Sequence, residues 1–159
     1  MKLILEQLRE GRDVLPVAET CQVVDHGERR EMALDGELTV DNTGSRVLVH
    51  GSLHAHGRSV CARCLAECDQ DYGVEVAIVI LRTGEGREAP EGEEWIIRQR
   101  SGVVDLAEPL REATALGLPL RTLCRDDCRG LCPHCGADLN DGPCGCDEPA
   151  ADPRWDALP

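Results

Sequence analysis

The chain has 159 residues and a formal net charge of −13, with one Tyr, two Trp and no Phe. This length suits one domain with an appendage, and the core must be built from aliphatic side chains. A chain this acidic is a poor non-specific ligand for nucleic acids, whose phosphates attract Lys and Arg, and it is better suited to a basic protein partner. The apolar stretch in residues 1–13 is too short for a signal peptide, and no run is long enough to span a membrane, so we expect a cytoplasmic protein without membrane association.

The first half of the chain has the pattern of an antiparallel sheet. Residues 3–8 fit either a short strand or a helix. A strand is expected at 34–40 and a turn at 41–44, followed by a strand at 46–56 in which apolar residues alternate with polar ones. These two strands are predicted to pair as a hairpin, with a tight turn following at 61–65.

The second half continues the sheet and then adds one helix. The β-branched stretch 72–81 predicts a central strand. Residues 83–94 are acidic, rich in Gly and without periodicity, which indicates a mobile, solvated loop. Short strands are expected at 95–98 and 102–104.

The helix is predicted to begin at Asp105. Asp105 and Glu108 fit a capping-box-like pattern, and Gly117 with the following Pro119 ends the element. One apolar stripe on the helix would face the sheet and consists of Leu106, Leu110 and Ala113.

The last quarter of the chain is crowded with cysteines, which predicts a metal site. Thiolates suit a tetrahedral zinc ion, and clustered cysteines in a reducing cytosol are more often metal ligands than disulfides. In the stretch from Cys132 to Cys135, Pro133 restricts φ and Gly136 permits a positive φ, as in a zinc knuckle. The candidate ligands are Cys124, Cys128, Cys132, Cys135, Cys144 and Cys146.

The spacing of these cysteines leaves the ligand set open. Cys132 and Cys135 can be completed by the upstream pair Cys124 and Cys128 or by the downstream pair 144 and 146. One zinc ion is expected, and six thiolates could also bridge two ions. Disulfides, a redox dithiol at Cys132 and Cys135, or an iron–sulfur cluster are the chemical alternatives. An all-thiolate site has no open coordination position for catalysis, so we expect a structural metal and no enzyme.

A second, smaller cluster contains Cys61, Cys64 and Cys68. Two ligands do not complete a metal site, although His54 and His56, or two cysteines crossing over from the tail, would do so. The alternative is a tight turn with buried thiols, because free Cys is among the most buried residue types. The histidines are expected on the solvent-exposed face of their strand.

The tail LCRDDCRGLCPHCGADLN…CGC…DPRWDAL closely resembles the YceD family of large-ribosomal-subunit RNA accumulation proteins. The resemblance extends to Cys61-Ala62-Arg63-Cys64-Leu65, which is similar to the family's CxRCL element, and to Asp105-Leu106. It implies a cytosolic factor needed for normal accumulation of the large ribosomal RNA. It also implies a basic ribosomal protein or a large-subunit precursor particle as the partner.

Together these observations predict an α+β protein. A mainly antiparallel β-sheet body with one helix, residues 1–120, would carry a C-terminal zinc-binding hairpin within a Cys-rich tail, residues 121–159. The predicted function is a non-enzymatic factor in large-subunit biogenesis. The alternative is a zinc-containing adaptor, or a redox or zinc sensor, that acts outside ribosomes.

Overall fold

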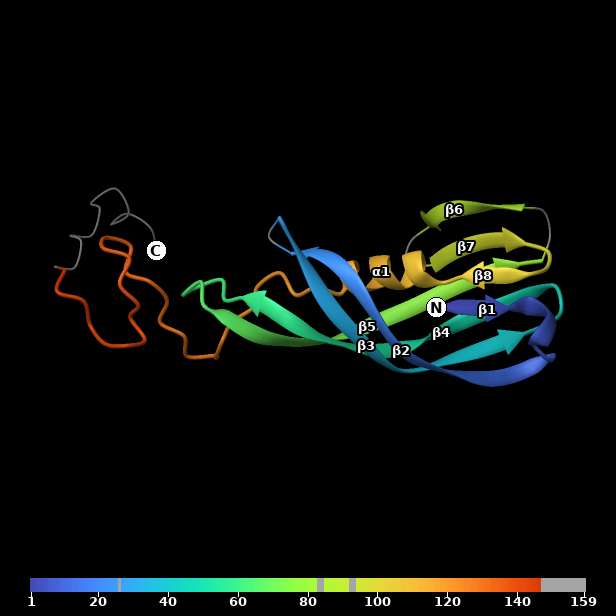
Figure 1. Cartoon of the computed structure of the whole chain (residues 1–159), viewed down its shortest axis with the longest axis horizontal. Helices are drawn as coiled ribbons and strands as arrows, with labels where there is room; N and C mark the ends of the chain where they lie inside the picture. The colour runs from blue at the N-terminus through green and yellow to red at the C-terminus, as the bar shows by residue number, and fades with distance from the viewer. Residues whose placement is uncertain (26, 83–84, 92–93, 147–159) are drawn as a thin grey trace, which may run out of the picture.

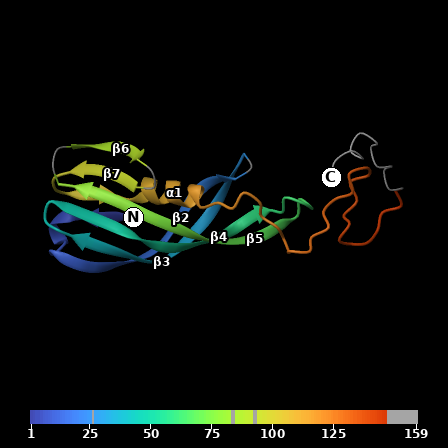
Figure 2. The same cartoon turned by 180° about the vertical axis from the view of Figure 1, so that it is seen from behind.

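A long, twisted β-sheet forms the body of the protein in the computed structural model (Figures 1 and 2). The structure describes residues 1–25, 27–82, 85–91 and 94–146, and the side chains of 85–91 and 94 are not part of that description. The sheet has the strand order β2-β3-β4-β5-β7-β6. Its strands are β2 (Gly11–Asp25), β3 (Glu28–Asn42), β4 (Arg46–Val60), β5 (Glu67–Leu81), β6 (Glu85–Glu91) and β7 (Glu94–Gln99).

Strands β2 to β5 are antiparallel neighbours of 15 residues each. The predicted hairpin of 34–40 with 46–56 is confirmed, since Leu34 lies opposite Ala55 and Asn42 opposite Val47. The central position of β5 is confirmed too, because it pairs with β4 on one side and with β7 on the other. The β5–β7 pairing is parallel, so the sheet is mixed at this edge.

Strand β2 and the first part of β3 had no counterpart in the sequence prediction. Strand β2 is an edge strand with Pro16 in it, and only Val17, Val23 and Asp25 of its residues are buried. An edge strand that is exposed on most positions lacks the apolar alternation by which strands are recognised.

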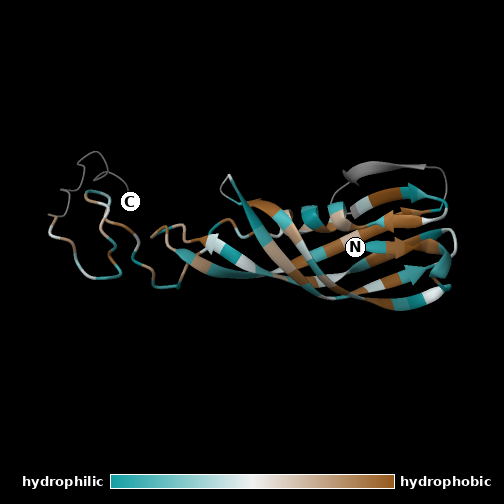
Figure 3. Cartoon of the chain, viewed as in Figure 1, coloured by the Kyte–Doolittle hydropathy of each residue, from teal (hydrophilic) through white to brown (hydrophobic). Residues whose placement is uncertain are grey.

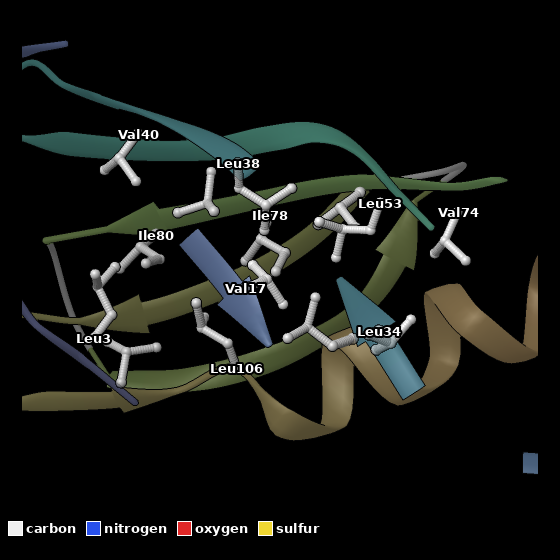
Figure 4. Packing of buried hydrophobic residues seen from close by; sticks show 14 of the residues in the cluster. Leu3, Val17, Leu34, Leu38, Val40, Leu53, Val74, Ile78, Ile80 and Leu106 are labelled. Carbon is white, nitrogen blue, oxygen red and sulfur yellow. The ribbon is translucent and has the colours of Figure 1, made fainter. Parts of the chain in front are cut away.

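One face of the sheet is covered and forms the core. The covering elements are helix α1 (Ala107–Leu116) and a two-stranded sheet made of β1 (Lys2–Ile4) and β8 (Val103–Asp105). Val17, Leu34, Leu53 and Ile78 come from four different strands and converge with Leu106 in this layer (Figure 4). The alternation of apolar and polar residues along the long strands is visible as brown and teal bands (Figure 3). The aliphatic core expected from the composition is therefore confirmed, with the opposite face of the sheet left polar.

The start of the chain uses both conformations that the sequence allowed. Residues Lys2–Ile4 form strand β1, and Leu5–Gln7 form a short 3-10 helix. The prediction of a loop at 83–94 is wrong for the part that the structure describes, since β6 pairs with β7 there. A strand that pairs on one side at the rim of a sheet needs no apolar periodicity, so this sequence gave no sign of it.

Helix α1 begins two residues later than predicted. Asp105 is the last residue of β8, and its Oδ1 accepts a hydrogen bond of 2.9 Å from the N–H of Ala107. The apolar stripe is as expected, with Leu106 and Leu110 buried, and the helix ends before Gly117. No helix in the described ranges is long and apolar enough to cross a membrane.

Tyr72, the one tyrosine of the chain, holds α1 against β5. Its hydroxyl donates a hydrogen bond of 2.9 Å to the carbonyl oxygen of Thr114. Burial, followed by the negative potential of Cys21 and Asp25, raises the pKa of Tyr72 to about 12 from the ordinary value of 10.0.

We therefore expect tyrosinate to form in the folded protein with a midpoint near pH 12. The neutral phenol is favoured by folding, so its contribution to stability is complete below the unfolded pKa of about 10 and is lost as pH rises through the folded value. Near-ultraviolet absorbance titration measures this directly, with the urea-unfolded chain as control. A midpoint in the folded protein equal to that in urea would contradict the prediction.

The substitution Tyr72→Phe should lower the free energy of unfolding by about 1 kcal/mol at neutral pH, because it removes the hydrogen bond to Thr114. It should also remove the loss of stability that ionisation of Tyr72 causes at high pH.

Candidate metal centre

The cysteine-rich segment lies beyond the end of the sheet at which the β4–β5 turn is found (Figure 1). Eight of the ten cysteines gather there in two groups of four. We call Cys61, Cys64, Cys124 and Cys128 the first cysteine cluster. We call Cys132, Cys135, Cys144 and Cys146 the second cysteine cluster.

The first cysteine cluster joins the β4–β5 turn to the beginning of the tail. The Sγ atoms of Cys61 and Cys128 are 3.8 Å apart, and those of Cys64 and Cys124 are 3.6 Å apart. Four sulfurs about 2.3 Å from a tetrahedral zinc ion lie about 3.8 Å from one another, whereas a disulfide needs about 2.05 Å. The donor set and its spacing therefore fit a zinc ion, and all four sulfurs lie within 4.8 Å of each other.

Hydrogen bonds to backbone carbonyl groups hold the two halves of the first cysteine cluster together. The N–H of Ala62 donates to the carbonyl oxygen of Thr122 at 2.8 Å, and the Arg63 side chain donates to the carbonyl oxygen of Cys128 at 2.7 Å. Leu123 and Leu131 pack against the buried thiols, so the cluster is the centre of a small second core. Its position is thus determined by the sheet as well as by the tail.

The second cysteine cluster is built from the tail alone. Its first two cysteines lie in a turn that is enclosed by an antiparallel bridge between Leu131 and Asp138. Cys132 is buried, Cys144 is half-buried, and Cys135 and Cys146 are exposed. All four sulfurs again lie within 4.8 Å of one another, which is compatible with a zinc ion.

The turns at Cys61–Cys64 and at Cys132–Cys135 have the same backbone hydrogen bonds. In the first turn Cys61 N–H donates to Ala66 O at 2.9 Å, Leu65 N–H donates to Cys61 O at 3.0 Å, and Arg63 N–H donates to Cys61 Sγ at 3.5 Å. In the second turn the equivalent three bonds are 2.8, 2.9 and 3.4 Å long, and their donors are Cys132, Gly136 and His134. Both turns therefore present two sulfurs in the geometry of a zinc knuckle.

The residue after the second cysteine of each turn has a positive φ. Gly136 has φ of 73°, as predicted, and Leu65 has φ of 61°. Leucine is a rare residue in this region because its Cβ crowds the backbone, at a cost of roughly 1–2 kcal/mol. The side chain of Leu65 is also 65% exposed, so no burial in the described structure offsets this strain.

Hydrogen bonds from N–H groups favour the thiolate form at the first cysteine of each turn. For Cys132, the backbone N–H groups of Cys135 and His134 lower the pKa to about 6. For Cys61, burial acts in the opposite direction, but bonds from the backbone of Cys64, Cys124 and Arg63 lower the pKa to about 6. A thiolate is the form that binds metal, so each cluster has at least one cysteine prepared for a cation. In the first cluster Cys128 is a second one: burial raises its pKa, but hydrogen bonds from the Asn140 side chain and the Gly130 backbone lower it below the ordinary value.

Asn140, in the segment between Cys135 and Cys144, forms a hydrogen bond to the first cysteine cluster. Its side-chain N–H group donates to Cys128 Sγ at 3.5 Å, and its Oδ1 accepts from the N–H of Arg129 at 2.8 Å. Such bonds to a ligand sulfur orient it and stabilise its charge. Gly130 allows the tail to approach the Cys61–Cys64 turn closely, since a Cβ at this position would meet the carbonyl oxygen of Arg63 at 3.1 Å.

The six tail cysteines singled out by sequence are thus divided by the structure. Cys132 and Cys135 lie with the downstream pair, while Cys124 and Cys128 cross over to Cys61 and Cys64. The expected tight turn at 61–65 with buried thiols is present, and its thiols also complete a four-sulfur set. The same Cys-x2-Cys spacing in both turns was the sequence signal that they have the same structure.

The remaining candidate ligands near the first cysteine cluster, Cys68 and two histidines, belong to neither group of four cysteines. Cys68 is buried beside the first cysteine cluster but is not one of its four members. His54 and His56 lie on the open face of the sheet, where they contact Asp71 and Asp35 at 3.0 and 3.1 Å. The prediction of solvent-exposed histidines on this face is confirmed.

These features define a class of protein: an α+β sheet protein with two all-cysteine groups that can hold metal ions. The model of the family described as "Large ribosomal RNA subunit accumulation protein YceD" matches residues 49–159, which include both groups. The chain belongs to the YceD family. The family description implies a role in the accumulation of large-subunit ribosomal RNA, and this family is not known as one of enzymes.

Relatives are found in mycobacteria. A Mycobacterium tuberculosis protein is 34% identical over 125 residues, which are 79% of this chain and 60% of the relative. A Mycobacterium leprae protein is 30% identical over 122 residues, which are 77% of this chain and 56% of the relative. Both carry the name uncharacterized protein, and the chain spans about 60% of the length of the Mycobacterium tuberculosis relative. No solved structure matches the chain.

The division of the cysteines makes a prediction about zinc stoichiometry. We expect native mass spectrometry of zinc-loaded protein to show two ions, one for each cluster. The double variants Cys61→Ser/Cys64→Ser and Cys132→Ser/Cys135→Ser should each retain one ion. Cys68→Ser is the matched control, since it removes a buried cysteine next to the first cluster and should retain both ions. A single ion in the parent protein, or loss of an ion from the control, would show that the ligands are shared differently.

The unequal burial of the clusters predicts an order of metal release. The first cluster exposes Cys124 alone, whereas the second exposes both Cys135 and Cys146, so a chelator or thiol reagent should reach the second cluster first. Release followed by a chromogenic zinc chelator should therefore have a fast and a slow phase. The variant Cys61→Ser/Cys64→Ser should show the fast phase alone, and Cys132→Ser/Cys135→Ser the slow phase alone. The reverse assignment would contradict the prediction.

Proposed function

We propose that this protein is a non-enzymatic factor in large ribosomal subunit biogenesis, with one structural zinc ion in each cysteine cluster. The observation that carries the proposal is the family match, which covers residues 49–159 and thus both clusters. An all-thiolate zinc has no open coordination position, which supports a structural role.

Zinc would make the tail a folded part of the protein. Residues 121–146 contain no regular helix or strand, so apolar packing within the segment is limited. Metal binding supplies folding free energy in such segments. In this proposal the tail, residues 121–159, is distinct from the body, residues 1–120, and the first cysteine cluster fastens one to the other.

The charge of the protein supports a basic partner in the cytoplasm. The chain has a net charge of −13, and each four-thiolate zinc adds further negative charge. Association with free RNA would be opposed by this charge, whereas a basic ribosomal protein, alone or in a large-subunit precursor particle, would be attracted. We therefore propose that contact with the particle is made through protein.

The proposal is tested in cells of the source organism depleted of this protein. We expect the ratio of large-subunit to small-subunit ribosomal RNA to fall, and large-subunit precursors to accumulate in sucrose gradients. Affinity purification of the tagged protein from growing cells should recover large-subunit proteins or precursors. Unchanged RNA ratios together with an eluate free of large-subunit components would refute the proposal.

Variants of the depleted protein test whether the first cysteine cluster is needed for the function. Cys61→Ser/Cys64→Ser should fail to restore the RNA ratio, because it releases the tail from the body. Cys68→Ser should restore it. If the double variant restored the ratio fully while lacking its zinc, the first cysteine cluster would have no part in the function.

A further inference from the structure

Strand β5 has a free edge in the middle of the molecule. It pairs with β4 along its whole length, but with β7 only from Ile78 to Leu81. Between Gly73 and Ala77, no strand in the described part of the chain occupies this edge. Backbone groups at such an edge are ready to pair with another extended chain.

A groove lies along this free edge, between β5 and helix α1. It encloses about 520 Å³, which is in the range of ligand-binding clefts. Its lining is mostly apolar and includes Val76, Ile78, Trp95, Pro109, Ala113 and Leu116. Leu116 is 79% exposed at the end of α1. Such an apolar surface beside an open strand edge is the combination on which strand addition depends.

The groove has a rigid wall and a defined end. The hydrogen bond from Tyr72 to Thr114 fastens α1 to β5. At the same end a Cβ on Gly117 would meet the carbonyl oxygen of Gly73 at 3.2 Å, so the helix closes on the strand there. At the other end β7 occupies the edge from Ile78 onwards. The free length of about five residues corresponds to roughly 17 Å of extended chain.

The two faces of β5 determine which side chains an added strand would need. Val74 and Val76 face the core side, whereas Glu75 faces the open side together with Asp71. An added strand follows the same alternation. Its residues on the core side would enter the apolar groove, and those on the open side would lie next to Glu75.

We propose that this groove is a docking site for an extended segment of a basic protein in which apolar residues alternate with Arg or Lys. The segment adds to the edge of β5 between Gly73 and Ala77, with its apolar side chains against α1 and its cations beside Glu75. Charge complementarity favours this occupant, because the chain has a net charge of −13 and Glu75 lies in the lining of the groove on the open face of β5. The other carboxylates of this face lie beyond the free edge, where Glu67 and Asp69 pair with Arg58 and Asp71 pairs with His54. This partner class rests on the proposed function, since a factor for ribosome assembly is surrounded by basic proteins.

Trp95 provides a direct reporter of the groove. The chain has two tryptophans, so a Trp155→Phe background leaves Trp95 as the sole emitter. The probe is a synthetic peptide in which arginine and valine alternate. We expect saturable change in Trp95 fluorescence with this peptide, and none with a peptide of the same composition whose arginines and valines are in separate blocks. No saturable change with the alternating peptide would overturn the proposal.

Matched substitutions locate the binding. Leu116→Arg places a cation at the groove and should weaken peptide affinity at least tenfold. Leu120→Arg makes the same change at a residue that is 96% exposed and outside the lining, and should leave affinity within twofold of the parent. Glu75→Arg should also weaken affinity, with Glu37→Arg on β3 as its control. Equal effects within each pair would show that the peptide is attracted by charge alone, which would refute the site.

Backbone methylation of the peptide tests strand addition. N-methyl groups on every second residue block hydrogen bonds along one edge of an extended chain. We expect one of the two registers to abolish binding and the other to retain it. Equal affinity for both would refute pairing with β5.

Two outcomes separate this proposal from the proposed function. Peptide binding at the groove together with normal ribosomal RNA ratios after depletion would retain the site and refute the function. Altered ratios that Leu116→Arg restores fully would retain the function and refute the groove as its docking site.

A second copy of the chain is the other occupant to be tested, by analytical ultracentrifugation. If the parent protein is a dimer and Leu116→Arg makes it a monomer, the occupant is a second copy and the proposal of a basic segment is overturned.

Discussion

The convergence of four sulfurs at the end of the β4–β5 hairpin is the constraint on which the position of the tail depends. Cys64 and Cys124 are 60 residues apart in the chain and 3.6 Å apart in space. A metal ion bound there would close this long loop and restrict the unfolded chain much as a cross-link does, with an entropic gain that grows slowly with loop length. The second cysteine cluster takes all four of its cysteines from residues 132–146, so a metal ion bound there would act within the tail.

The same arrangement gives the molecule two ends with different properties. Around the core, burial of aliphatic side chains between the sheet, α1 and β1–β8 provides the stability. Beyond the β4–β5 turn, apolar packing is reduced to a few residues around the first cysteine cluster, and coordination would have to replace it. This explains how one chain combines long regular strands with a segment that has almost no regular structure.

The groove beside α1 is a consequence of the change from antiparallel to parallel pairing at β5. β7 joins β5 in parallel and begins only at the level of Ile78, so the middle of β5 is left without a neighbour on that side. The helix that follows β8 passes next to this open edge and leaves Leu116 exposed. A surface with free backbone groups, apolar lining and carboxylates on one side is thus a consequence of topology and of the alternation along β5.

Sequence reasoning was most successful where the physical signal is local. The hairpin of β3 and β4, the interior strand β5 and the apolar stripe of α1 each show a period that reflects one buried face. Strand β2 and strand β6 were missed because they are edge strands, whose residues are stabilised by pairing with a neighbour rather than by an apolar pattern of their own. Pairing is a non-local property, and a single sequence has no direct sign of it.

The sequence by itself indicated the geometry of the Cys132–Cys135 turn and the presence of a tight turn at 61–65. A Cys-x2-Cys pair followed by a residue with positive φ needs nothing from the rest of the fold, and for this reason Gly136 could be understood before the structure was seen. The tertiary structure alone decided which pairs meet. The 15-residue strands β4 and β5 carry the Cys61–Cys64 turn beyond the end of α1 to the level of Thr122, and Cys124 and Cys128 meet it there instead of joining Cys132 and Cys135. The spacing of two cysteines determines how one turn places its two sulfurs, but the length and register of the strands determine which second pair of cysteines lies next to that turn.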